Sequence, residues 1–135
     1  GDPDLLVLDE PTAGLDPEQA LRFRELLTGR DADRAVVLST HQTDDVAALC
    51  QRVLVILGGA VRFDGRPADL TATADAHVWV ADDRDAAAQL AWAGPDGRVR
   101  HVGDPPAGAE LVPPTLEDGY LLLVGAGGAT IEAAA

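Results

Sequence analysis

Two acidic residues and a histidine occupy positions from which they could act together on a phosphate group. Asp9 and Glu10 follow the apolar run Leu5–Leu8, and His41 follows a second apolar run that ends in Ser39-Thr40. A carboxylate at the end of a buried strand can hold Mg²⁺ directly or through water. A neighbouring acid can orient or deprotonate an attacking water, and an imidazole can donate a hydrogen bond to a terminal phosphate. These residue types are therefore sufficient for the metal and water side of a phosphoryl-transfer site.

Each of these residues also has a purely structural interpretation. An Asp-Glu pair after an apolar run is often a solvated strand end, and a single histidine after a strand is often a turn residue or a hydrogen-bonded cap. The joint arrangement of these residues with the segment Pro11–Asp16 favours the functional interpretation.

The elements that must position these side chains are two buried strands. Leu5–Leu8 and Ala35–Leu38 are apolar without alternation, which is typical of strands covered on both faces of a parallel sheet. Ligands of such sheets bind beyond the carboxyl ends of the strands, so we expect Asp9, Glu10 and His41 to converge on one rim.

The segments around these strands predict an α/β domain. Asp16-Pro17 indicates the N-cap and first residue of a helix that ends near Gly29, with an apolar face of leucines and Phe23. Thr43 or Asp44 is expected to cap a second helix through Leu49. A hairpin follows, with strands over 52–57 and 60–63 around Gly58-Gly59, and then one helical turn over 67–70. The alternation of strands and helices predicts a parallel sheet of three strands.

A shift in composition at residues 71–74 suggests three regions. We predict a first domain over 1–72, a small α+β accessory domain over 73–124, and a flexible Gly/Ala-rich tail over 125–135. Within the accessory domain we expect, in order, a strand over 77–81, a helix over 85–92, a strand over 98–102, a loop over 103–114 and a last helix from Thr115. Trp79 and Trp92 are expected to pack this domain.

The composition excludes several functions. The net charge is −13, and all ten basic residues are arginine, so the chain cannot contain a phosphate-binding G-x-x-x-x-G-K-[ST] loop. The acidic balance argues against a nucleic-acid partner. The single Cys50 excludes an intramolecular disulfide and is expected to be a buried core thiol. No apolar segment reaches the length of a membrane span.

The run from Leu5 to Pro17 resembles the Walker B strand and D-loop of ATP-binding cassette (ABC) ATPases, and Ser39-Thr40-His41 stands where that family has its switch histidine. Residues 42–53 and 59–67 continue the resemblance, which covers residues 1 to about 70. The segment Pro113–Leu121 is similar, more weakly, to the C-terminal extension of the drug- and antibiotic-exporter subfamily.

The resemblance implies a role for each matched residue. Asp9 would hold Mg²⁺ through water, Glu10 would polarise the attacking water, and His41 would contact the γ-phosphate of ATP. Asp16 and the D-loop would face a second ATPase subunit, expected to be an identical copy. Transmembrane permease subunits would be the other partners, and the protein would lie on the cytoplasmic face of the membrane.

The sequence departs from the family pattern in having no Walker A loop, no Q-loop and no LSGGQ-like signature. The resemblance therefore implies a partial P-loop NTPase core that lacks its N-terminal half and is followed by the α+β appendage. We expect the parent protein to be an ATPase and the isolated chain to be inactive. One alternative is a non-catalytic module that binds a full-length ABC ATPase. Another is the DNA-repair or translation branch of the superfamily, which the acidic charge disfavours.

Overall fold

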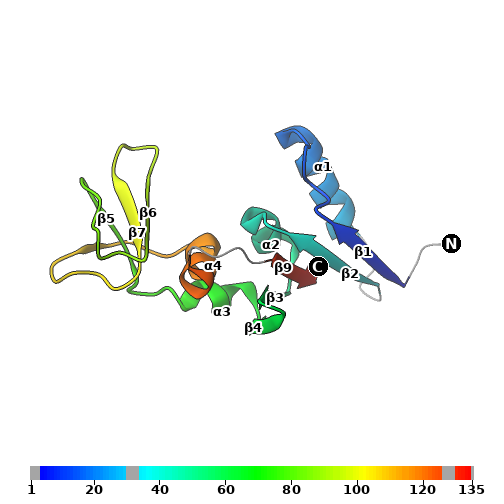
Figure 1. Cartoon of the computed structure of the whole chain (residues 1–135). Coiled ribbons are helices and arrows are strands. Elements are labelled where there is room, and N and C mark those ends of the chain that lie inside the picture. Colours follow the sequence, from blue (N-terminus) through cyan, green and yellow to red (C-terminus); the bar gives the residue numbers. More distant parts are fainter. Residues whose placement is uncertain (1–3, 30–33, 126–129, 135) are drawn as a thin grey trace. The chain divides into compact units, whose positions relative to one another are not determined.

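The chain divides into two compact units, each with its own β-sheet. The computed structural model describes residues 4–29, 34–125 and 130–134 (Figure 1). The first unit comprises Gly1–Pro67 together with Ala129–Ala135, and the second comprises Ala68–Gly128. The division falls within helix α3 (Pro67–Ala72), five residues before the boundary suggested by composition.

The first unit is a mixed α/β fold around a five-stranded sheet with the order β1-β2-β9-β3-β4. Its elements are β1 (Leu5–Asp9), α1 (Pro17–Thr28), β2 (Ala35–Thr40), α2 (Thr43–Leu49), β3 (Arg52–Leu57), β4 (Ala60–Gly65) and β9 (Thr130–Ala134). Strands β1 and β2 are parallel neighbours, paired from Leu5 with Ala35 to Asp9 with Ser39. Their carboxyl ends therefore lie at the same edge of the sheet, as the sequence predicts.

Strand β9 corrects two predictions. The flexible tail predicted over 125–135 is wrong for Thr130–Ala134, which pairs antiparallel with both β2 and β3; residues 126–129 and 135 lie outside the described residues. The three predicted parallel strands are consequently not all neighbours, because β9 lies between β2 and β3. The physical reason is backbone pairing: two strands with unpaired N–H and C=O groups can accept a strand of almost any composition between them.

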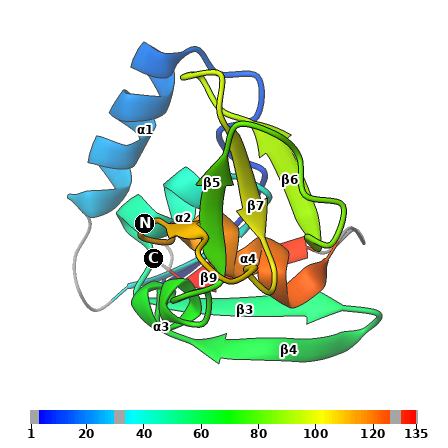
Figure 2. The same ribbon diagram turned by 90° about the vertical axis from the view of Figure 1, so that its left-hand side faces the viewer.

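The hairpin of β3 and β4 follows its sequence signal. Gly58 and Gly59 have φ values of 60° and 76°, which a two-residue turn between twisted strands requires (Figure 2). Helix α1 begins as predicted, with Asp16 in a capping box with Gln19. The prediction that Thr43 or Asp44 caps helix α2 is wrong. The N-cap residue of this helix is Gln42, and no side chain makes a capping hydrogen bond there.

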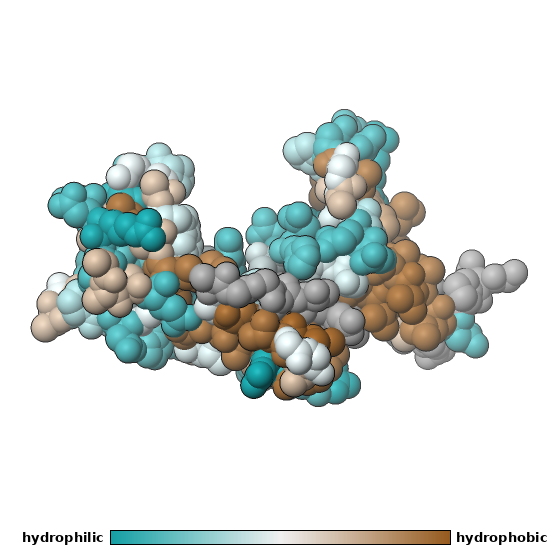
Figure 3. Space-filling model, in the orientation of Figure 1, coloured by the Kyte–Doolittle hydropathy of each residue, from teal (hydrophilic) through white to brown (hydrophobic). Residues whose placement is uncertain are grey.

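The first unit has a small core and an open apolar surface. Its buried apolar side chains come from β2, α2, the residue that ends α2, and β3, namely Val36, Leu38, Val46, Leu49, Cys50, Val53 and Val55. The prediction that both strands are covered on their two faces is wrong for β1, where Leu5 and Val7 are 56% and 67% exposed. Helix α1 buries no residue, so it covers little of the sheet and leaves Leu21 and Leu26 in solvent. Figure 3 shows apolar surface where β1 lies in Figure 1.

The second unit is an antiparallel sheet with the order β6-β7-β5-β8. Its strands and last helix are β5 (Val78–Ala81), β6 (Leu90–Ala93), β7 (Val99–Val102), β8 (Glu110–Leu111) and α4 (Leu116–Val124). Ala74, Val78 and Val102 form its buried centre, against which Trp92, Val112 and Leu122 pack. Trp79 is 2% exposed. The prediction that the two tryptophans pack this part of the chain is confirmed.

The helix predicted over 85–92 is wrong. Leu90–Ala93 is a strand that pairs antiparallel with β7, and Asp85 accepts a hydrogen bond from the backbone of Ala87 in a local turn. The alanine-rich run has a high intrinsic helix propensity, but propensity is a weak preference that sheet pairing overrides. The predicted loop over 103–114 also contains the short strand β8.

Candidate functional site

The candidate site begins where β1 ends. Asp9 is the last residue of β1 and is exposed, and Glu10 follows with a φ of 44°. This left-handed conformation is uncommon for a residue other than glycine, and such strained positions cluster at functional sites. The Glu10 N–H donates to the carbonyl of Ser39 at 2.7 Å, which ties the strained residue to the end of β2.

Two residues at the end of β2 approach the Glu10 carboxylate. The Thr40 hydroxyl donates to Glu10 Oε2 at 3.4 Å, and His41 Nε2 lies 3.6 Å from Glu10 Oε1. The Thr40 side chain is buried, whereas the His41 side chain is 63% exposed. The carboxylate thus lies between a buried hydroxyl, which donates to it, and a nearby imidazole that faces solvent.

The structure brings together three of the four site residues that the sequence singles out. Asp9, Glu10 and His41 share one edge of the sheet. Asp16 has a different environment: its carboxylate accepts the Gln19 N–H at 2.8 Å, and its own N–H donates to Gln19 Oε1 at 3.2 Å. Asp16 therefore caps helix α1 in the described structure.

Sequence reasoning missed Thr40. Its hydroxyl also accepts the Gln42 N–H at 2.9 Å, so it links the Glu10 carboxylate to the residue that follows His41. The sequence carries no signal for it, because residues 35–38 are apolar without alternation; only the structure shows that Val36, Leu38 and Thr40 are the buried residues of β2. A polar residue at the last buried position of a strand is expected to need a partner.

The residues at the carboxyl edge of the first sheet fit a cation that takes most of its ligands from a bound phosphate or from water. Among the described residues, no group of three or more His, Cys, Asp or Glu side chains could hold a metal ion. Asp9 offers exposed carboxylate oxygens, the donor type that Mg²⁺ prefers, and Mg²⁺ in phosphate sites commonly takes only one or two carboxylates.

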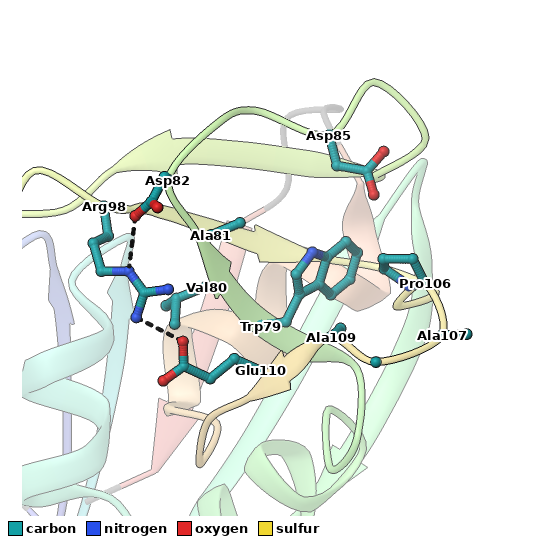
Figure 4. A pocket seen from close by; sticks show the side chains of 11 residues that line it. Trp79, Val80, Ala81, Asp82, Asp85, Arg98, Pro106, Ala107, Ala109 and Glu110 are labelled. Atoms are coloured by element: carbon teal, nitrogen blue, oxygen red, sulfur yellow. Dashed lines mark ion pairs between the residues drawn. The ribbon is translucent and has the colours of Figure 1, made fainter.

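The second unit has a separate hollow of about 390 Å³ beside Trp79 (Figure 4). The Trp79 ring stacks on His101 with centroids 5.1 Å apart and planes 5° apart. Arg98 lies in the wall with Nη1 2.7 Å from Glu110 and Nε 3.5 Å from Asp82. Its guanidinium is thus committed to two carboxylates, and the hollow lacks the acid–histidine arrangement of the first unit.

The fold and the site together define an α/β protein with a candidate ligand-binding edge at its sheet. The first unit is an α/β fold with polar side chains at the carboxyl ends of adjacent parallel strands, where such folds bind their ligands. Within residues 4–29, 34–125 and 130–134, no helix is long and apolar enough to cross a membrane.

About half of the chain is homologous to the ATP-binding proteins of ABC transporters, although no family model matches it. The chain is 44% identical over 73 residues to the Nod factor export ATP-binding protein I of Rhizobium etli, a match over 51% of this chain and 22% of that protein. It is 42% identical over 71 residues to the energy-coupling factor transporter ATP-binding protein EcfA2 of Ligilactobacillus salivarius, covering 51% and 25%. The phosphonates import ATP-binding protein PhnC 2 of Pseudomonas savastanoi is 39% identical over 70 residues, covering 50% and 25%.

The chain spans about a quarter of the length of these curated relatives. Their names include both export and import proteins, so the similarity supports an ABC ATP-binding protein without favouring a transport direction.

Proposed function

We propose that the first unit supplies the water-activating and γ-phosphate-contacting part of an ATP-hydrolysing site in an ABC transporter ATP-binding protein. The observation that carries the proposal is the position of the Glu10 carboxylate between Thr40 and His41 at the carboxyl ends of two parallel strands. The resemblance of 5–17 to a Walker B strand and D-loop, and the homology to ABC ATP-binding proteins, support it.

Each side chain has one task in this proposal. Glu10 orients the attacking water and accepts its proton, which is general-base catalysis and is typically worth about 10²–10⁴ in rate. Thr40 keeps one carboxylate oxygen engaged, so that the other faces His41. The exposed imidazole of His41 donates to an oxygen of the γ-phosphate and stabilises the charge that develops there.

Asp9 would hold Mg²⁺, either directly or through water. The ion would neutralise phosphate charge when it is bound with ATP. The other ligands would come from the phosphates, because the described residues offer no larger cluster of metal ligands.

The remaining parts of the site must come from elsewhere. A lysine-bearing phosphate loop is required, and this chain has no lysine. We propose that the turn over 10–16, with Asp16, faces a second ATPase subunit, and that the complex works on the inner face of the membrane with transmembrane permease subunits. The finer assignment to an exporter rests on the resemblance of residues 113–121.

The test compares two carboxylate-to-amide substitutions in the complete protein with its permease subunits. Glu10→Gln should lower phosphate release by at least about 100-fold while ATP binding, measured by equilibrium filtration, stays within threefold. Glu18→Gln is the matched control, since Glu18 is a 73% exposed residue on α1 whose partner is Arg22.

Two results would overturn the proposal. One is a Glu10→Gln variant with turnover close to that of the wild type. The other is tight binding of Mg-ATP by the 135-residue chain alone in calorimetry, because a half-site without a phosphate loop should bind nucleotide weakly.

A further inference from the structure

Asp45 is a buried carboxylate that the chemistry proposed above does not use. It lies in the first turn of α2 and is 3% exposed. An acidic side chain is almost never buried to this extent unless it is paired. Asp45 is paired on both oxygens: Oδ1 accepts from Arg24 Nε at 2.8 Å and Arg24 Nη2 at 2.6 Å, and Oδ2 accepts from the Thr12 hydroxyl.

These contacts connect the two loops that leave the candidate site. Thr12 belongs to the turn that follows Glu10, and Asp45 belongs to the helix that follows His41. Arg24 adds helix α1, which is in contact with α2. One carboxylate on helix α2 therefore links that helix to the β1–α1 loop and to helix α1.

The turn that holds Thr12 also determines where Glu10 lies. The Glu10 carbonyl accepts the Ala13 N–H at 3.1 Å, and the Thr12 carbonyl accepts the Leu15 N–H at 3.1 Å. Glu10 itself has the strained φ of 44°, which persists only when its surroundings hold it in place. Movement of Thr12 would therefore be transmitted to the Glu10 backbone.

We propose that Asp45 is a positioning residue, which fixes Glu10 relative to His41 by holding Thr12. This inference rests on the function proposed above and adds a residue to it. Asp45 does not touch the reacting groups. It acts through the Thr12 hydroxyl on one side and through its place on the helix after His41 on the other. Arg24 balances its charge, so that the carboxylate remains an acceptor although it is buried.

The test removes the hydroxyl and keeps the shape of the side chain. Thr12→Val leaves the Asp45–Arg24 pair in place, whereas a change at Asp45 would remove the carboxylate from Arg24, whose side chain is 32% exposed. We expect kcat of the complete protein to fall by about 10- to 100-fold with KM within threefold, because displacement of a catalytic group by about 1 Å has costs of this size. Thr12→Ser keeps the hydroxyl and should restore kcat.

A second readout does not depend on ATP. Hydrogen exchange at the Ala13 and Leu15 amides should become at least about tenfold faster in Thr12→Val, because the turn opens more often. Thr28→Val is the matched control: its hydroxyl also makes a hydrogen bond, to the carbonyl of Glu25 at 3.1 Å, but on the exposed end of α1. It should change neither readout.

The outcomes separate the two proposals. If Glu10→Gln abolishes turnover while Thr12→Val leaves both turnover and exchange unchanged, the role of Asp45 is refuted and the proposed function stands. Faster exchange with unchanged kcat also refutes the positioning role. If Glu10→Gln leaves turnover intact, the proposed function itself fails.

Discussion

Among the glycines of the described structure, Gly119 leaves the least room for a Cβ atom against neighbouring backbone. The substitution Gly119→Ala therefore tests the packing of the second unit. An ideal Cβ at this position would lie 2.2 Å from the Leu70 carbonyl oxygen, 2.9 Å from the Leu70 carbonyl carbon and 3.3 Å from Thr71 Cα. All three atoms belong to the backbone of helix α3, so none of them can rotate away as a side-chain atom could. Helix α4 would have to move by about 1 Å to reach the 3.4 Å of an ordinary contact.

The expected cost follows from two opposing effects. Alanine is favoured over glycine in a helix by up to about 1 kcal/mol. Overpacking typically costs about 1–3 kcal/mol, and displacement of α4 would also disturb Leu70, which is 1% exposed. The net loss should therefore be about 1–2 kcal/mol, which lowers the midpoint of a domain of this size by about 4–16 °C.

Tryptophan fluorescence is a selective assay for this change. The chain has two tryptophans, Trp79 and Trp92, and both lie in the second unit. Gly29→Ala is the matched control, because a Cβ at Gly29 meets nothing closer than 3.5 Å and lies in the first unit. A fluorescence midpoint for Gly119→Ala equal to or above that of the wild type would refute the close approach of α4 to α3.

Three further predictions concern two buried titratable groups, Asp118 and Cys50. Asp118 is fully buried and accepts hydrogen bonds from Arg100 Nε at 3.0 Å and from the Thr115 N–H at 2.7 Å. Asp118→Ala should therefore lower the free energy of unfolding by about 3–5 kcal/mol, because it leaves the Arg100 charge uncompensated. The fluorescence transition in urea measures this loss, and Asp83→Ala, at an exposed position, should leave the transition unchanged. Burial, and secondarily Asp45, raises the pKa of Cys50 from 9.0 to about 12. Only about one thiol in ten thousand is ionised at pH 8, so iodoacetamide should label Cys50 in urea and hardly at all in the native protein. The thiol of the unfolded chain ionises at a lower pH than the buried thiol, so the contribution of Cys50 to stability is complete below pH 9 and is lost between pH 9 and 12. Cys50→Ala should remove this pH dependence of the free energy of unfolding. An identical pH profile in the variant would contradict the prediction.

The convergence of Asp9, Glu10 and His41 could be predicted because it depends on local signals and one general rule. Continuous apolar runs indicate strands, although of the two only β2 is buried, Asp16-Pro17 indicates the start of the intervening helix, and the crossover makes the strands parallel. Asp9 is the last residue of β1, and Glu10 and His41 directly follow β1 and β2, so all three lie at the carboxyl edge of the sheet. The roles of these residues in catalysis stay predictions.

The partners of these residues could not be predicted in the same way. Thr40 reaches Glu10 across 30 positions of sequence, and Asp45 reaches Thr12 across 33. Thr40 and Asp45 look like ordinary strand-end and helix-surface residues in the sequence. Their importance depends on burial, which leaves a polar group dependent on a partner from another element.

The sequence by itself determined the strands and helices between Leu5 and Gly65, the acidic pair, the histidine and the absence of a lysine-bearing phosphate loop. These properties depend on residue type and short-range spacing alone. Only the tertiary structure decided that Thr130–Ala134 enters the first sheet between β2 and β3, and that Leu90–Ala93 is a strand. The physical reason is the same in both cases: strand pairing satisfies backbone groups that are far apart in sequence, and local propensity is too weak to oppose it.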